Sequence, residues 1–86
     1  MKRNLNLVKK ILKWTIKNCE PGKWRHSWDI KIPGYTRSEI TNHLRIMGSG
    51  FGQGELIENK DISTLSSEAY YVVGVTWKGY EFLKDN

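Results

Sequence analysis

The sequence contains one cysteine, two prolines and no apolar run of membrane-spanning length. A single cysteine excludes a disulfide within the chain, which fits the reducing cytoplasm, so we predict a cytoplasmic protein. Cys19 ends an apolar stripe, and we interpret it as a small buried residue rather than a nucleophile. Lysines interrupt the apolar N-terminal segment, so neither a secretion signal nor a membrane contact is predicted.

Acidic residues are scarce in the first half of the chain. Residues 1–47 carry eleven Lys or Arg against three acidic residues, whereas residues 48–86 carry three against six. This asymmetry indicates either a face for a polyanion or an electrostatically steered protein partner. Solvated helix faces without any partner are the alternative, and composition alone leaves it open.

The first predicted helix covers residues 4–19, with Asn4 or Asn6 as its N-cap. Apolar or small residues recur at steps of three and four and form one stripe: Leu5, Val8, Ile11, Leu12, Thr15, Ile16 and Cys19. Four lysines fall on the other side: Lys9, Lys10, Lys13 and Lys17. Pro21 and Gly22 then stop the helix.

A strand and a second helix are predicted next. Alternation of apolar and polar residues over 28–32 is typical of a half-buried strand, and Pro33-Gly34 predicts a turn after it. Thr36 and Glu39 have the spacing of a capping box for a helix over residues 36–47. Ile40, Leu44 and Met47 are expected inside. The outer side is expected to carry Arg37, Ser38, Thr41, Asn42 and Arg45.

Glycines occupy four alternate positions in "GSGFGQG", residues 48–54. A phosphate-binding loop requires Lys and then Ser or Thr after its last glycine, but Glu55 stands there. The spacing also fails the dinucleotide pattern, and a helix precedes the loop where a strand is needed. We therefore interpret this stretch as a connection, in which Gly48 ends the helix in a left-handed conformation and Phe51 packs or makes an apolar contact.

A hairpin of two strands, in residues 55–63 and 69–77, and a short terminal helix capped by Thr76 complete the prediction. The order helix, strand, helix, hairpin wing, helix predicts one α+β domain, a degenerate winged helix-turn-helix with a single helix between Gly34 and Glu55. Its expected core is Leu5, Val8, Leu12, Ile16, Ile30, Ile32, Ile40, Leu44, Leu56, Ile57, Tyr71, Val73, Val75, Trp77 and Phe82. Tyr80 is expected to help dock the last helix.

Four segments carry a resemblance to a known family: "MKRNLNLVKKIL", "IPGYTRSEITNHLRIM", "GELIE" and "VTWKGYEFL". In this order they resemble the domain of unknown function 2513 family, small proteins frequent in phages and prophage regions. The resemblance implies a winged-helix-like fold and almost nothing about activity. The glycine stretch is a departure, because the family pattern passes from the helix to the wing almost directly.

Duplex DNA binding is the function that such a fold suggests. Arg37, Ser38, Thr41, Asn42 and Arg45 have side chains suited to base edges and phosphates, and Lys9, Lys10, Lys13 and Lys17 are candidates for further phosphate contacts. The acidic hairpin argues against this reading, because its segment 58–68 carries three acidic residues and one lysine.

A protein-interaction module, as a homodimer or as an adaptor or inhibitor of a host factor, is the alternative. Trp14, Trp24 and Phe51 are its candidate contacts, because aromatic residues dominate interface energetics. No enzyme, cofactor, metal or small-molecule substrate is predicted, since His26, His43 and Cys19 share no ligand spacing.

Overall fold

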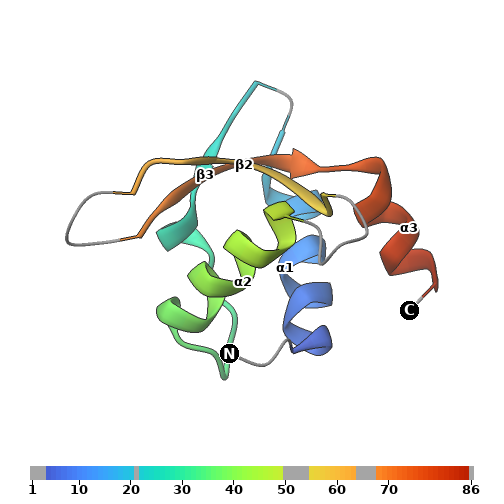
Figure 1. Ribbon diagram of the computed structural model, residues 1–86, viewed down its shortest axis with the longest axis horizontal. Helices are drawn as coiled ribbons and strands as arrows, with labels where there is room; N and C mark the ends of the chain where they lie inside the picture. Colours follow the sequence, from blue (N-terminus) through green and yellow to red (C-terminus); the bar gives the residue numbers. More distant parts are fainter. Residues whose placement is uncertain (1–3, 21, 50–54, 64–67, 86) are drawn as a thin grey trace.

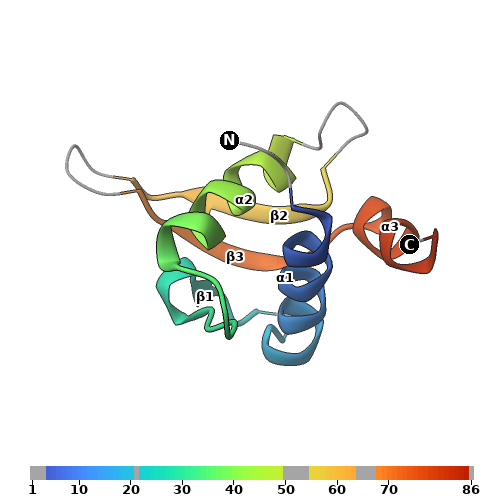
Figure 2. The same ribbon diagram turned by 90° about the horizontal axis from the view of Figure 1, so that it is seen from below.

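The computed structural model describes residues 4–20, 22–49, 55–63 and 68–85. Figure 1 shows their elements in chain order: helix α1 (Leu5–Asn18), strand β1 (Arg25–His26), the 3-10 helix η1 (Ser27–Asp29), helix α2 (Arg37–Ser49), strands β2 (Ile57–Asp61) and β3 (Tyr70–Val75), and helix α3 (Trp77–Asp85). Both long helices lie on the same face of the sheet, as the view from below also shows (Figure 2).

The three strands form an antiparallel sheet in the order β1-β3-β2. The fold is therefore α+β, and its helix, strand, helix, hairpin, helix order is compatible with the predicted winged-helix-like arrangement. As expected, α2 is the one helix among the described residues between Gly34 and Glu55. The short η1 lies between β1 and α2, where a winged helix has a further helix.

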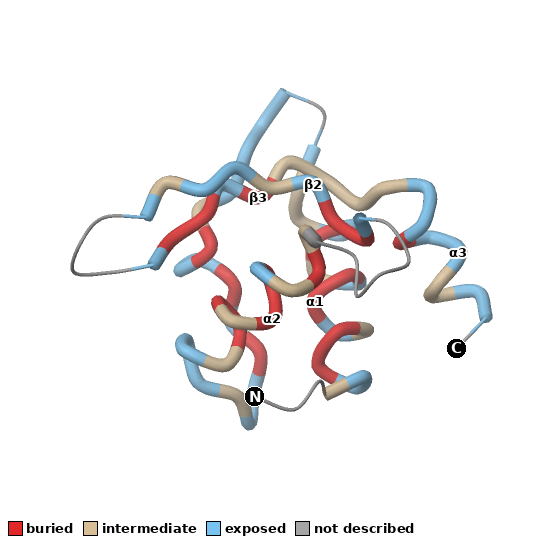
Figure 3. Tube along the Cα trace, in the orientation of Figure 1, coloured by how far each residue is buried: buried red, intermediate tan, exposed pale blue. Residues whose placement is uncertain are grey.

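Helix α1 begins as predicted at Asn4, whose side chain accepts a hydrogen bond from the Leu7 amide. Its buried side is rotated from the predicted stripe, however: Leu5 and Ile16 are exposed, and Leu7 is fully buried. Figure 3 shows that the buried stretches of α1 and α2 lie toward the interior between these helices and the sheet. The core expectation for Leu5 and Ile16 is wrong because both lie at the edge of the buried arc.

The predicted strand over residues 28–32 is also wrong, although Ile30 and Ile32 are buried. The chain turns through η1 instead, where the Ile30 amide donates to the Ser27 carbonyl. Ser27 is buried and its Oγ accepts a hydrogen bond of 3.0 Å from the Tyr70 amide. That distant contact brings Ser27 inside and leaves Trp28 on the surface.

The capping box at the start of α2 is confirmed. The Thr36 amide donates to Glu39 Oε1 at 3.0 Å, and the Glu39 amide donates to Thr36 Oγ1 at 3.1 Å. The helix runs past Met47, so Gly48 is helical and the expectation of a left-handed Gly48 is wrong.

Two contacts hold the C-terminal part of α2 to β2 and to the residue before it. Gly48 has no side chain, which leaves room for the amide group of Asn59, and that group donates to the Leu44 carbonyl at 3.0 Å. The Leu56 amide donates to the Met47 carbonyl, also at 3.0 Å. The glycine stretch therefore lies between Met47 and Leu56, whose backbones are hydrogen-bonded to each other, while Phe51 lies outside the described part.

Strand β3 faces the helices with Tyr70 and Val72, so the core expectation for Tyr71 is wrong. Successive β2 residues Glu58 and Asn59 pair with Gly74 and Val72, which leaves Val73 as the extra residue of a bulge. Val73 is half-buried rather than part of the core, and past the bulge Val75 packs against the core.

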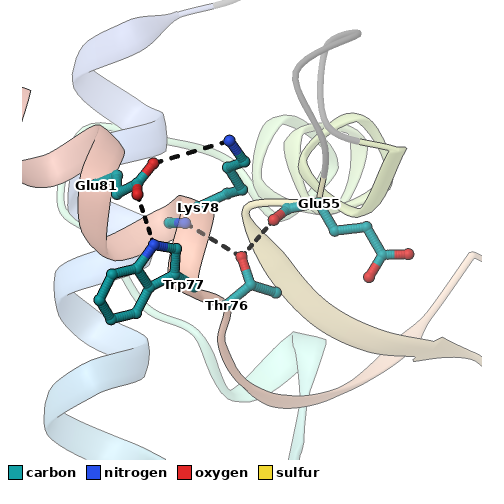
Figure 4. A network of polar contacts seen from close by, with 6 residues as sticks. Glu55, Thr76, Trp77, Lys78 and Glu81 are labelled. Carbon is teal, nitrogen blue, oxygen red and sulfur yellow. Dashed lines mark hydrogen bonds and ion pairs between the residues drawn. The ribbon is translucent and has the colours of Figure 1, made fainter.

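Thr76 caps the start of helix α3, as predicted. Thr76 Oγ1 accepts from the Gly79 amide at 3.1 Å and donates to the Glu55 carbonyl (Figure 4). The Thr76 amide also donates to the Leu56 carbonyl, at 3.2 Å. These bonds tie the start of α3 to the chain just before β2.

The aromatic residues at the start of α3 do not dock as expected. Trp77 is 77% exposed, and its indole N–H donates to Glu81, while Tyr80 is exposed as well. Phe82 and Leu83 pack against the core instead. The predictions for Trp77 and Tyr80 are wrong because the helix presents its opposite side to the core.

Gly79 allows α3 to approach the backbone of Leu56. A Cβ at this position would overlap the Leu56 carbonyl oxygen and Val75 Cγ1. We expect Gly79→Ala to lower the free energy of unfolding by about 1–3 kcal/mol, because a backbone carbonyl cannot rotate away from the added methyl group. Urea unfolding followed by circular dichroism measures the change.

The matched control is Gly74→Ala, since a Cβ at Gly74 meets nothing within 4 Å. We expect this variant to change stability by no more than about 0.5 kcal/mol. Equal stability of the two variants would contradict the close approach at Gly79.

Candidate nucleic-acid interface

An open groove with a volume of about 550 Å³ runs along α1. Lys10, Lys13 and Lys17 line it from the helix, and Lys31 lines it from the segment after η1. Trp14, Asn18, Ile32 and Pro33 complete the lining, so none of the described residues along the groove is acidic. We call these eight residues the basic groove; Lys9, the fourth predicted lysine, is half-buried and is not among them.

Arg37 continues this positive surface to the start of α2. A second hollow, lined by residues 30–35, Arg37 and Ile40, shares Lys31, Ile32 and Pro33 with the basic groove. Lys10 Nζ lies 5.5 Å from the centre of the Tyr35 ring, across the same connection. The first turn of α2 and the lysine side of α1 therefore border two adjacent hollows that meet at residues 31–33.

The other α2 residues predicted to bind nucleic acid differ in their exposure. Thr41 is buried and its hydroxyl donates to the Arg37 carbonyl at 2.9 Å, so its predicted place on the outer side is wrong. Ser38 and Arg45 are exposed and Asn42 is half-buried.

Arg45 lies toward the hairpin. Burial raises the pKa of the Tyr70 hydroxyl, the negative charges of Asp61 and Glu68 raise it further, and the positive charge of Arg45 opposes them. Arg45 therefore shares its surroundings with two hairpin carboxylates, whereas no carboxylate lines the described part of the basic groove.

Exposed aromatic rings lie across the outer face of the sheet. Of these residues, the sequence identifies only Trp24 as a candidate contact. His26 and Lys60 both pair with Tyr71, and directly paired residues of antiparallel strands point to the same face. Because Tyr70 and Val72 face the helices, Tyr71 faces away from them. Its strand partners His26 and Lys60 therefore lie on the outer face as well.

Neighbouring rings on this face are in contact, in the spatial order Trp28, His26, Tyr71 and Trp24. Ring centres lie 5.1 Å apart for Trp28 and His26, 5.9 Å for His26 and Tyr71, and 6.1 Å for Tyr71 and Trp24. We call Trp28, His26, Tyr71 and Trp24 the aromatic row. The exposed fractions of Trp24, Trp28 and Tyr71 are 46%, 36% and 39%.

A cation stands at each end of the aromatic row. Arg37 Cζ lies 4.4 Å from the centre of the Trp28 ring, and Lys60 Nζ lies 4.7 Å from the centre of the Trp24 ring. Arg37 therefore belongs to both surfaces, since it also borders the depression next to the basic groove.

Both histidines have structural hydrogen bonds. His26 Nδ1 accepts from the Trp28 amide at 3.0 Å. His43 is buried on α2. Its Nε2 accepts a hydrogen bond from the Asn4 amide at 3.0 Å. The proton is therefore on Nδ1, which donates to the Glu39 carbonyl at 2.8 Å. No group of three or more His, Cys, Asp and Glu residues in the described ranges is placed to hold a metal ion.

The three residues predicted as protein contacts have different surroundings. Trp14 is half-buried, packs against the core and lines the basic groove. Trp24 is exposed within the aromatic row, and Phe51 lies outside the described part.

The family model described as "Hypothetical protein (DUF2513)" matches residues 2–86, so the chain belongs to this family. No curated protein and no solved structure matches the chain. Within the described residues, none of the helices has the length and apolar character needed to cross a membrane.

Cys19 packs against the core beside β3, and its thiol points to the Val72 carbonyl, with Sγ 3.8 Å from the oxygen. Burial raises the pKa of the Cys19 thiol, and the nearby Arg25 only partly opposes this. Because the thiolate is the reactive form, we expect Cys19 to be alkylated slowly at neutral pH and faster only above the ordinary pKa of a thiol. Iodoacetamide kinetics across pH, followed by mass spectrometry, measure this.

The same chain unfolded in urea is the control for Cys19 reactivity. Equal alkylation rates of the folded and unfolded chains at neutral pH would contradict the half-buried, protonated thiol.

Proposed function

We propose that this domain binds nucleic acid through the basic groove and Arg37. The observation that carries the proposal is the convergence of four lysines from two segments on one groove, with Arg37 at the adjoining hollow. Lys10, Lys13 and Lys17 come from α1, and Lys31 comes from a segment more than ten residues further along the chain.

Electrostatics favours a polyanionic ligand for this groove. Like charges that gather on one surface repel each other, and no carboxylate among the described lining residues offsets that repulsion. A chain of phosphates neutralises several lysines at once and releases condensed counterions, which is the main source of affinity in non-specific nucleic-acid binding. Trp14 gives the groove an apolar part beside the charges.

Helix α2 would add contacts to a duplex. Ser38, Asn42 and Arg45 remain accessible on it, and Arg37 lies at its first turn. Exposed carboxylates on the hairpin, Glu58, Asp61 and Glu68, oppose a phosphate backbone there. Binding is therefore proposed for the side of α1 and the start of α2, away from these carboxylates.

Helix α3 favours a second candidate function, a contact with a protein partner. Trp77 is 77% exposed, and Tyr80, one helical turn later, is exposed too. Large aromatic side chains on one helix face are typical of interface anchors. A second copy of this chain is the simplest such partner.

The phosphate contacts are tested by neutralising one lysine of the groove. We expect Lys13→Gln to weaken binding to a mixed-sequence duplex and to reduce the slope of log affinity against log salt by about one unit. Fluorescence anisotropy at several salt concentrations measures both quantities.

Lys78→Gln is the matched control, because Lys78 is an exposed lysine on α3 that pairs with Glu81 at 3.9 Å. The same loss of net charge there should leave the salt slope unchanged. Equal effects of the two substitutions would show a response to net charge alone, and the absence of binding to any nucleic acid at low salt would refute the proposed function.

Self-association through α3 is tested by solution mass. If Trp77 anchors a dimer, light scattering gives twice the monomer mass for the unmodified chain and the monomer mass for Trp77→Ser. A monomer mass for the unmodified chain at high protein concentration would reject the dimer.

A further inference from the structure

We propose that the aromatic row on the outer face of the sheet is a stacking surface for the bases of single-stranded nucleic acid. This inference rests on the proposed function and narrows it: the ligand class is a single strand, with phosphates held by the cations and bases held by the rings.

The rings of the aromatic row are not needed to fill the core. The sheet buries Tyr70 and Val72 against the helices, whereas Tyr71, Trp24 and Trp28 keep more than a third of their surface exposed on the other side. Each ring lies next to the following one, with successive centres 5.1 to 6.1 Å apart, so the four rings make a connected surface rather than scattered exposed residues.

The cations decide the chemistry of the ligand. Arg37 and Lys60 lie over the rings at opposite ends of the aromatic row, so each end offers a positive charge next to an aromatic face. A nucleotide carries both matching groups, a flat base and a phosphate, and single-strand binding sites combine aromatic stacking with positive charge in this way. The guanidinium plane of Arg37 is itself a stacking partner for a base.

The position of Arg37 joins this surface to the basic groove. Arg37 borders the hollow that shares Lys31, Ile32 and Pro33 with the basic groove, and it covers Trp28 at the start of the aromatic row. A flexible strand can lay phosphates along the groove and pass Arg37 onto the rings. A duplex cannot use the rings in the same manner, because its bases are already paired and stacked.

One carboxylate limits the surface at its Trp28 end. The Trp28 indole N–H donates to the Glu68 carbonyl at 3.3 Å, so Glu68 adjoins this end of the aromatic row, whereas Asp61 pairs with Tyr70 and so lies on the face toward the helices. The charge of Glu68 repels phosphates from its own surroundings, which leaves the path past Arg37 toward the basic groove as the favourable one.

Tryptophan fluorescence tests the inference directly. The full chain is titrated with an unlabelled oligothymidylate of about fifteen nucleotides, and with a duplex of equal length, at low salt. We expect the single strand to quench the fluorescence and to bind more tightly than the duplex. Trp28→Leu and Tyr71→Thr should each weaken single-strand binding about tenfold, and should leave duplex binding within about twofold.

Trp77→Leu is the matched control, because Trp77 is the more exposed tryptophan and lies on α3, outside the aromatic row. It should lower the total fluorescence without changing the affinity for the single strand. Thermal unfolding of every variant establishes that it folds. If a ring variant does not fold, the test uses Lys60→Gln instead, a surface substitution at the other end of the row.

The outcomes separate this inference from the proposed function. If Lys13→Gln weakens single-strand binding but the row variants do not, the basic groove binds nucleic acid and the stacking surface is refuted. If the unmodified chain binds neither the single strand nor the duplex, both fail together. If the chain self-associates through Trp24 or Tyr71 and does not bind the oligonucleotide, the aromatic row is a protein contact and the inference is overturned.

Discussion

The pairing of β3 with strands on both of its edges is the constraint on which the rest of the structure depends. Because β1 and β2 both pair with it, successive β3 residues from Tyr70 to Val72, before the bulge, are committed to opposite faces of the sheet. Tyr70 and Val72 are directed to the helices, and Tyr71 is placed between His26 and Lys60 on the outer face. One antiparallel register therefore determines both the core and the aromatic row.

The two ends of β3 extend this constraint to the neighbouring elements. At its start, the Tyr70 amide bonds to Ser27, which holds η1 against the sheet and leaves Trp28 beside His26. At its other end, the bulge at Val73 returns Val75 to the core, and Thr76 bonds to the chain just before β2. Helix α3 can then pack closely because Gly79 has no side chain to meet Leu56.

Sequence reasoning succeeded where the signal is local. The Asn4 cap, the capping box of Thr36 and Glu39, and the Thr76 cap each involve residues three positions apart, and the structure contains all three. It failed where a distant partner decides. Nothing near Trp28 in the sequence indicates that Ser27 bonds to Tyr70. A run of apolar residues on both faces of β3 does not indicate which face is buried, so the sequence wrongly predicts Tyr71 in the core.

In the candidate site, too, local features could be predicted from the sequence and distant contacts could not. The lysine side of α1 could be read from helical spacing, but its junction with Lys31 and Arg37 depends on how the segment after η1 crosses α1. Arg37 turns to Trp28 and Thr41 bonds inward, so fewer side chains remain on α2 for base edges than its sequence indicates. The hairpin beside α2 carries carboxylates, whereas the described lining of the basic groove carries none. Charge therefore supports the proposed ligand path from α1 through Arg37 to the outer face of the sheet, whereas the order of the elements alone predicts contacts from α2 and the wing.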